Sequence, residues 1–229
     1  MPLCHLSSNM LRATFVITLL APSFSFAEDL EKDALALVAK LGGTATIDPK
    51  LDEIARVAVK FDTANDAILQ KIAKTIVVGS IVITDATPCT EAGFIALKEL
   101  PDLQILGMVK CQLTDKEAVA IGSIRALNEL FLGESKLNDI SFVGLKKLVN
   151  LKKLDVIDAA ITDKSAPVLL SMKKLEELNL SGTKFGDPGV EQLKDLTKLK
   201  LLRLNKTNAT RKSIDILEAA RGKELTVRW

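Results

Sequence analysis

Histidine, cysteine and paired carboxylates are the side chains most able to support catalysis or hold a metal, and this sequence offers few of them. Its one histidine, His5, lies in an N-terminal stretch of 27 residues that has the character of a removable leader. Without that stretch no Ser–His or Cys–His pair can form, and no histidine-containing metal site. Two cysteines remain, too few for the usual four-ligand zinc site. We therefore expect no catalytic, cofactor-binding or metal-binding residues, and a protein that is not an enzyme.

The two remaining cysteines, Cys89 and Cys111, have two interpretations. They fall in turns of neighbouring sequence units, so the turns could bring the two sulfur atoms within bridging range. Export from the cytoplasm would permit a disulfide, but backbone geometry decides whether the bond forms. We favour two free, buried thiols over the disulfide.

Aspartate recurs at one position of five units. The five are Asp66, Asp115, Asp139, Asp163 and Asp187. Each is followed by a stretch in which every third or fourth residue is apolar, which is the pattern of a helix. Because an aspartate at a helix start can accept hydrogen bonds from the free N–H groups of the first turn, we predict that this row caps helices, rather than binding a metal or catalysing a reaction.

A repeat of 24 residues positions all of these side chains. In LEELNLSGTKFGDPG, which starts at Leu175, the leucines are spaced by three residues and then by two. Similar segments start at Leu103, Leu127, Leu151 and Leu199, and weaker ones at Ile54 and Val78. A fixed period of this length predicts a stacked solenoid, in which units share one continuous core. The residues around the second and third leucines should form a short strand in each unit.

The units match the pattern L-x-x-L-x-L-x-x-(T/C/S/A)-x-(I/L/F)-(T/N/G)-D over about 175 residues, and the chain thus resembles the leucine-rich repeat family. The small residue or cysteine at the ninth position resembles the cysteine-containing subtype. The chain is also similar to short secreted repeat proteins of bacteria, notably planctomycetes. The resemblance implies an α/β leucine-rich repeat solenoid, a short curved array with a parallel β-sheet on the concave side and helices on the convex side. It also implies protein–protein recognition on the concave sheet.

The chain divides into three predicted parts. Residues 1–27 combine a basic residue, an apolar run and small residues, which predicts a secretory signal peptide cleaved after Ala27. Residues 28–53 should form a helix and a hairpin that cap the open end of the solenoid. Residues 54–229 hold about seven units and a terminal strand, whose last residue, Trp229, is expected to cover the end of the core.

The leader predicts a secreted or periplasmic protein, whether Met1 or Met10 is the true start. The net charge of +2 gives no indication of a nucleic-acid partner. The apolar run of the leader is too short to span a bilayer, so we expect no stable membrane insertion after cleavage. Asn-x-Ser/Thr sequons occur at Asn179, Asn205 and Asn208. They would accept glycans in a eukaryotic secretory pathway, but we favour chance sequons in a bacterial protein.

The third, fifth and seventh residues of each unit should face the concave side, because side chains alternate along a strand. At the ends of the array they are mostly polar or charged. In the middle they include Val82, Ile105, Val109, Phe131 and Ile157, with Gly107 and Gly133 leaving room beside Phe131. Glu129, Glu134, Asp155 and Asp158 should form an acidic rim.

An apolar centre with a charged rim is the usual anatomy of a protein-binding surface. We therefore predict that an unidentified protein binds at Val82, Ile105, Val109, Phe131, Asp155 and Ile157, and that the acidic rim favours basic groups on it. The alternative at this site is that Phe131 folds down over the glycines. The alternative functions are a spacer or stalk without a specific ligand, and an inhibitor or accessory subunit of a secreted enzyme.

Overall fold

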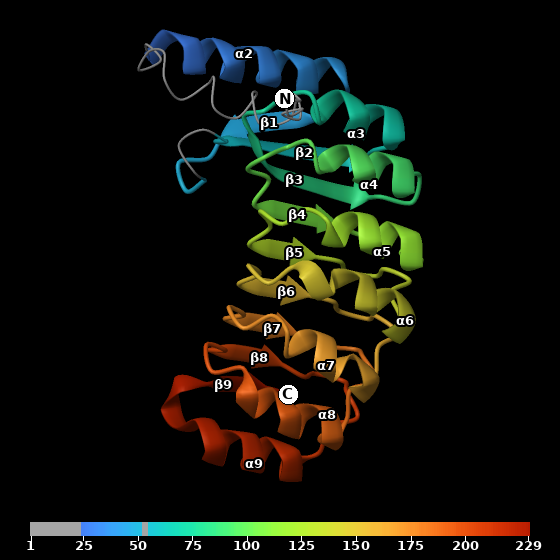
Figure 1. Cartoon of the computed structure of the whole chain (residues 1–229), viewed down its shortest axis with the longest axis vertical. Helices are drawn as coiled ribbons and strands as arrows, with labels where there is room; N and C mark the ends of the chain where they lie inside the picture. Colours follow the sequence, from blue (N-terminus) through green and yellow to red (C-terminus); the bar gives the residue numbers. More distant parts are fainter. Residues whose placement is uncertain (1–23, 52–54) are drawn as a thin grey trace, which may run out of the picture.

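The computed structural model describes residues 24–51 and 55–229. Its described part is one sheet of nine strands in sequence order, parallel except for β1. The strands are β1 (Thr44–Ile47), β2 (Val57–Thr63), β3 (Val78–Asp85), β4 (Ile105–Met108), β5 (Glu129–Phe131), β6 (Lys153–Asp155), β7 (Glu177–Asn179), β8 (Leu201–Arg203) and β9 (Thr226–Arg228). Figure 1 shows them stacked along the long axis of the molecule.

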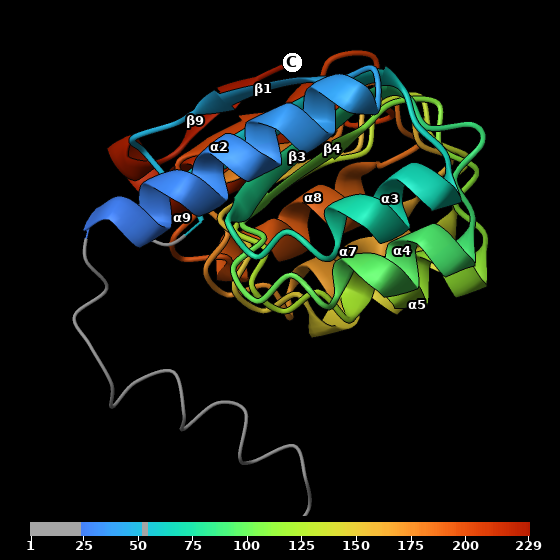
Figure 2. The ribbon, with the colours of Figure 1, turned by 90° about the horizontal axis from the view of Figure 1, so that it is seen from above.

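Helices cover one face of this sheet. They are α3 (Asp66–Ile72), α4 (Glu91–Leu97), α5 (Asp115–Gly122), α6 (Asp139–Phe142), α7 (Ala166–Leu169) and α8 (Asp187–Gln192), with the 3-10 turns η1 (Val143–Lys147), η2 (Asp163–Ser165) and η3 (Leu193–Asp195). In the end-on view of Figure 2, α3, α4, α5, α7 and α8 lie together on one side. The predicted α/β leucine-rich repeat solenoid is therefore confirmed. The sheet face opposite these helices is called the concave face below.

The core follows the leucine pattern. The second leucine of each unit lies in register with its neighbours, and Leu106, Leu130, Leu154, Leu178 and Leu202 are all at most 2 % exposed. The predicted helix rows are buried as well, for example Phe142, Leu145 and Leu148. Each unit therefore contributes buried side chains from its strand segment and from its helix to a core that runs through the array.

The ninth residue of each unit stabilises the turn after the strand. The hydroxyl groups of Ser135, Thr183 and Thr207 donate to the carbonyl oxygens of Leu132, Leu180 and Leu204 at 2.7–2.8 Å. These are the side-chain bonds that the small polar residues at this position predict. Ala159 has no such group, and there the backbone N–H of Ala159 bonds to the carbonyl oxygen of Val156 at 3.1 Å.

The eighth residue of five consecutive units adopts a left-handed backbone, with φ of 59° at Lys110, 52° at Glu134, 58° at Asp158, 74° at Gly182 and 57° at Lys206. Only glycine adopts this conformation without steric cost. The turn keeps the units joined, because the N–H of Asp158 bonds to the carbonyl oxygen of Ser181 at 2.9 Å, and the N–H of Gly182 to that of Asn205 at 2.8 Å. The leucine pattern alone did not indicate these turns.

The predicted role of the aspartate row is wrong. The helix-capping residue is the one before the aspartate, for example Asn138 and Thr162. The aspartate instead bonds to the next unit. Asp139 accepts from the N–H of Thr162 at 2.8 Å, from its hydroxyl at 2.7 Å and from the hydroxyl of Ser165 at 2.7 Å. The row therefore joins consecutive units, because stacking brings each capping residue beside the preceding aspartate.

Asp66 and Asp187 likewise accept from the N–H and hydroxyl groups of Thr90 and Thr210, and Asp163 accepts from the N–H of Gly186 alone. Two units differ. There the N–H of the capping residue bonds within its own helix, Thr114 to Glu117 at 3.1 Å and Asn138 to Ser141 at 3.0 Å. From Thr90 onward, each capping N–H thus has one acceptor, either the preceding aspartate or its own capping-box side chain.

We expect Asp139→Ala to lower the free energy of unfolding by about 1–2 kcal/mol, because it removes the acceptor of three hydrogen bonds, one of them from the backbone. Asp115→Ala is the matched control. Asp115 is exposed and the next capping residue does not need it, so its removal should cost less than about 0.5 kcal/mol. Urea unfolding at pH 7 compares the two, and equal losses would contradict the inter-unit role.

The loss of stability in Asp139→Ala should depend on pH. Burial would raise the pKa of Asp139, but the hydrogen bonds from Thr162 and Ser165 outweigh it and hold that pKa below its ordinary value. A depressed pKa contributes stability above the unfolded-state pKa of about 3.9 and loses it as the pH falls. The difference between wild type and Asp139→Ala should therefore shrink below about pH 4. A difference that stays constant to pH 2.5 would contradict this.

The N-terminal end of the array is closed by α2 (Phe24–Lys40) and β1, with α2 lying across that end in Figure 1. The predicted hairpin forms, with β1 antiparallel to β2. Glu31 of α2 is 7 % exposed and ion-paired to Arg56 at 2.8 Å. The predicted signal peptide lies largely in residues 1–23, outside the described residues, and its last four residues belong to α2.

The first unit has a different register from the predicted one. Ala58 and Lys60 pair with Ser80 and Val82, an offset of 22 residues rather than 24, and the ladder is irregular between Val57 and Ala58. Ala58 and Lys60 therefore occupy the third and fifth positions rather than the fifth and seventh. Arg56 leaves the concave face and pairs with α2 instead.

The C-terminal end is closed by α9 (Arg211–Arg221), the turn η4 (Gly222–Glu224) and β9. Ile214 and Leu217 of α9 are buried, as is Leu225, and Val227 is partly buried. Trp229 does not cover the core as predicted. It is 52 % exposed, with the guanidinium of Arg211 5.6 Å from its ring centre. The helix α9 shields the core end instead, because its apolar face is larger than one indole ring.

Candidate protein-binding face

The concave face presents three rows of side chains that cross the strands. The third-position row contains Ser80, Ile105, Glu129, Lys153, Glu177, Leu201 and Thr226. The fifth-position row contains Lys60, Val82, Gly107, Phe131, Asp155, Asn179, Arg203 and Arg228. The seventh-position residues, among them Val109, Gly133 and Ile157, follow where the strands end. Successive strands lie about 4.8 Å apart.

The structure brings the apolar residues of the predicted site onto four neighbouring units. Val82 and Phe131 are 37 % and 36 % exposed and lie in one row with Gly107 between them. Ile105, Val109 and Ile157 are half-buried. We call Val82, Ile105, Val109, Phe131 and Ile157 the apolar patch. Large apolar groups this exposed are otherwise found on the helices, in the turns that follow them and at the ends of the described array.

The glycines beside Phe131 are covered by other side chains. A Cβ atom on Gly107 would lie 3.4 Å from a methyl carbon of Val82, and one on Gly133 would lie 3.3 Å from Cγ2 of Ile157. No atom of Phe131 comes within 4 Å of that position on Gly133. Val82 and Ile157 therefore lean over the glycines and Phe131 does not fold down onto Gly133, which leaves its ring available to a partner.

The expected acidic rim is only partly present. Lys153 lies between Glu129 at 3.1 Å and Glu177 at 3.7 Å, and its hydrogen bond to Glu129 raises the pKa of Lys153. Asp155 accepts from the side-chain amide of Asn179 at 2.7 Å and from the N–H of Ile157 at 3.0 Å. These groups are satisfied within the protein, so they do not indicate a basic partner.

Glu134 and Asp158 are the acids of the rim that stay free. Both are exposed, and neither forms an ion pair within residues 27–51 and 55–229. They lie at the left-handed eighth positions, beyond the strand ends and beside the apolar patch. The sequence did not show which acids are neutralised, because the ion pairs join neighbouring units.

The sequons differ in accessibility. Asn179 is 9 % exposed, and both its amide groups are used, since its oxygen also accepts from the N–H of Ser181 at 3.1 Å. A glycan there would displace these bonds. Asn205 and Asn208 are exposed.

The two cysteines are free and buried, at 2 % exposure for Cys89 and 0 % for Cys111. The thiol of Cys89 contacts the carbonyl oxygen of Ala64 at 3.3 Å. Burial raises the pKa of each thiol to about 12. Since the thiolate is the reactive form, neither is a nucleophile at neutral pH. Within the described residues, no group of three or more His, Cys, Asp or Glu side chains is placed to hold a metal ion.

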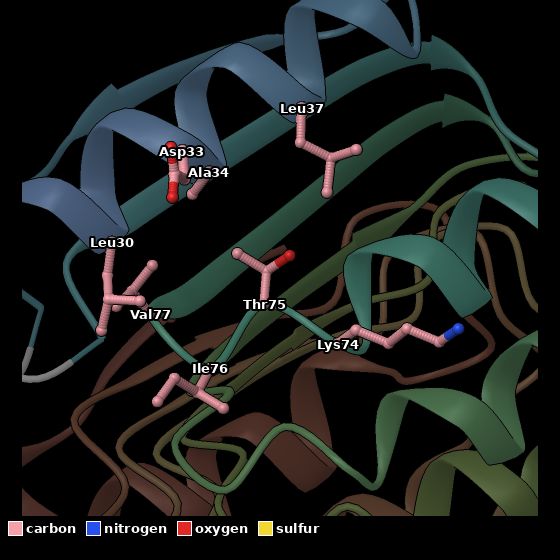
Figure 3. Close-up of a pocket in the computed structure, with 8 residues that line it drawn as sticks. All are labelled: Leu30, Asp33, Ala34, Leu37, Lys74, Thr75, Ile76 and Val77. Carbon is pink, nitrogen blue, oxygen red and sulfur yellow. The ribbon is translucent and has the colours of Figure 1, made fainter.

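A small groove lies at the N-terminal end, between α2 and the segment before β3 (Figure 3). Its volume is about 300 Å³, and its apolar lining includes Leu30, Leu37 and Val77. Asp33 and Lys74 are its only charged residues, and Figure 3 shows them at separate places on its lining. The groove therefore brings together no acid–base pair, and it lies away from the apolar patch.

The concave face also carries a pair of adjacent arginines that the sequence analysis did not predict. The sequence predicts a terminal strand, but it does not predict that Arg228 of this strand lies beside Arg203. The two residues are register partners on β8 and β9. The alternation of Leu225 and Val227 along the last strand was the available signal, because it places Arg228 on the concave side.

Comparison with known proteins identifies the fold. Residues 171–194 match the family model described as Leucine Rich repeat. The chain is similar to the crystal structure of an internalin (inlF) from Listeria monocytogenes, with a TM-score of 0.56 and 21 % identity over 76 % of this chain and 48 % of the internalin chain. The chain thus spans about half the length of that protein. A leucine-rich repeat protein from Leptospira interrogans matches with a TM-score of 0.49 and 18 % identity, again over 76 % and 48 %.

No curated protein sequence matches the chain significantly. In the part of the chain that the structure describes, no helix has the length and apolar character needed to cross a bilayer.

Proposed function

We propose that this leucine-rich repeat protein is a secreted or periplasmic protein-binding module that holds its partner on the concave face. The observation that carries the proposal is the apolar patch, which exposes Phe131 and Val82 in a fifth-position row whose other side chains are polar or charged. Arrays of this fold are typically binding modules without enzymatic activity. Fully burying a side chain such as Phe131 or Val82 contributes about 1.5–3 kcal/mol, so the patch is large enough to anchor a partner.

The localisation part of the proposal rests on residues 1–27, whose composition is that of a signal peptide cleaved after Ala27. The subtype is also a proposal. The small residue or cysteine at the ninth position, Cys111 in one unit, supports the cysteine-containing type of repeat. Three of these ninth residues hold their turns through hydroxyl groups, so small polar residues replace the asparagine common at that position.

A spacer or stalk is the second candidate. It has no need of exposed apolar groups on the concave face, so the apolar patch favours the binding module. An inhibitor or accessory subunit of a secreted enzyme would use the same face. It differs only in the identity of the partner, and capture of that partner decides between them.

Phe131→Ala is expected to weaken capture of the partner from an extracytoplasmic fraction by about 30-fold or more, because large aromatic side chains at the centre of an interface commonly contribute 2 kcal/mol or more. The fold should remain intact, since the side chain is 36 % exposed and does not belong to the buried core. Titrated pull-downs with the full chain measure the change, and thermal unfolding checks the fold.

Val119→Ala is the matched control. Val119 is 57 % exposed on the convex helix α5, so its truncation removes exposed apolar surface without touching the concave face. Capture should be unchanged. Full-strength capture by a folded Phe131→Ala, Ile105→Ser double variant would exclude the concave site and direct attention to the convex helices.

A further inference from the structure

Two arginines lie side by side at the C-terminal end of the concave face. Arg203 on β8 and Arg228 on β9 are register partners, and both belong to the fifth-position row. Like charges directly opposite each other on neighbouring strands destabilise a sheet. Within residues 27–51 and 55–229, neither arginine forms an ion pair or a side-chain hydrogen bond. Nothing described in the chain therefore offsets their repulsion.

Three other arginines of the array have clear structural roles. Arg56 pairs with Glu31 and joins α2 to the sheet. Arg211 pairs with Asp215 at 2.6 Å, within α9. Arg221 donates to backbone carbonyl oxygens that precede β8, among them that of Thr197 at 2.7 Å. The pair at β8 and β9 differs, because it faces outward from the sheet and stabilises no other element.

Acidic side chains of the same row do not reach the pair. Asp155 lies on β6, two strands from Arg203, which is about 10 Å at ordinary strand spacing. Both its carboxylate oxygens already accept hydrogen bonds, one from Asn179 and one from the N–H of Ile157. Glu177 lies in the third-position row and forms an ion pair with Lys153. Within the third- and fifth-position rows, the acids closest to the arginines along the array are thus already engaged with other groups of the protein.

We propose that Arg203 and Arg228 bind a carboxylate group of an acidic peptide segment that lies on the concave face. This inference rests on the proposed function, because it assigns the segment to the partner held there. The planar guanidinium group matches a carboxylate with two parallel N–H···O bonds. Two adjacent guanidinium groups therefore offer a fixed set of donors, which a flexible lysine pair would not.

The distance to the apolar patch specifies the segment further. Phe131 lies on β5, so three strand steps, or about 14 Å, separate it from Arg203. An extended chain covers that distance in about four residues. The partner segment is thus extended along the array, with an apolar side chain at the patch and an acidic residue about four positions away.

Binding of fluorescently labelled poly-L-glutamate to the full chain at low ionic strength tests the carboxylate site. The Arg203→Gln, Arg228→Gln double variant should bind at least about tenfold more weakly, because it removes the charge-assisted bonds of both arginines. The control is Lys173→Gln, Lys198→Gln, which removes two exposed charges from the loops that lead into β7 and β8. It should change the affinity by less than about twofold, the scale of general screening effects.

Four outcomes decide the inference. Equal losses in the two double variants would show general attraction to positive charge and overturn it. Tighter binding of inorganic polyphosphate, with the same dependence on the arginines, would replace the carboxylate by a phosphate group. A lower melting temperature of the arginine double variant at low salt would show a structural role instead, whereas relief of the repulsion predicts an unchanged or higher one. Loss specific to the arginine variant, without loss of stability, supports the proposal.

Phe131→Ala separates this inference from the proposed function. Poly-L-glutamate has no apolar anchor, so its binding should not depend on Phe131. If Phe131→Ala leaves partner capture unchanged while the arginine variant still loses poly-L-glutamate, the apolar binding site fails and the carboxylate site stands.

Discussion

Leu154→Ala is expected to lower the free energy of unfolding by about 2–5 kcal/mol, which is a large part of the stability of an ordinary domain. Leu154 is 2 % exposed and lies in register between Leu130 and Leu178, so both neighbouring units lose contacts when its side chain is shortened. The surrounding strands are tied to one another by ladder hydrogen bonds and cannot collapse into the cavity. Urea unfolding followed by circular dichroism measures the loss.

The matched control is Leu201→Ala. Leu201 is a leucine on the same sheet, but it occupies the third position and faces the concave side, where it is only half-buried. Its truncation should cost about 1 kcal/mol or less, because little apolar surface is withdrawn from water there. An unchanged denaturation midpoint for Leu154→Ala, or equal losses for the two leucines, would contradict the assignment of the two faces.

Gly122→Ala is expected to be the second most damaging of these changes, at about 3 kcal/mol, the upper end of the usual range for overpacking. A Cβ atom on Gly122 would lie 2.0 Å from the carbonyl oxygen of Gly144, and one on Gly144 would lie 2.7 Å from the backbone nitrogen of Val119. Helix α5 and the turn η1 therefore touch backbone to backbone. No change of rotamer relieves such a contact, so the two units must move apart.

Gly107→Ala is the control for this prediction. A Cβ atom there meets only side-chain carbons of Val82, at 3.4 Å and beyond, which is ordinary van der Waals contact. Its stability should change by less than about 0.5 kcal/mol. Alanine stabilises a helix by up to about 1 kcal/mol relative to glycine, so a Gly122→Ala protein as stable as wild type would show that α5 and η1 are not in backbone contact.

The candidate site was partly predictable. The positions of Phe131, Val82 and Ile157 on the concave face follow from the alternation of side chains along a strand, and the structure places them there. The alternation did not show which acidic side chains around the apolar patch are free and which are paired. In the structure Lys153 lies between Glu129 and Glu177, and the two carboxylate oxygens of Asp155 each accept a hydrogen bond, so these acids are not free as the sequence predicts.

Beyond the first unit, the sequence by itself determined which face of each repeat strand and helix is buried. Its 24-residue period places equivalent residues in one row. Side chains alternate along a strand, so Leu130 points inward and Phe131 outward as long as neighbouring strands pair at an offset of one period. The helix rows, such as Phe142 and Leu145, follow from the spacing of three and four residues in the same way. Burial is a local property of pattern, so it needed no knowledge of neighbouring units.

Only the tertiary structure decided which groups meet between units. The contacts of Asp139 with Thr162, of Gly122 with Gly144 and of Arg203 with Arg228 all join residues that are 22 to 25 positions apart. They depend on how far one turn of the chain is displaced when it stacks on the next, and that displacement varies with local geometry. The first unit pairs at an offset of 22 residues from Ala58 onward and of 21 at Val57, so neither offset equals the 24-residue period. A repeat pattern records the average unit, whereas these contacts arise from the particular fit of two neighbours.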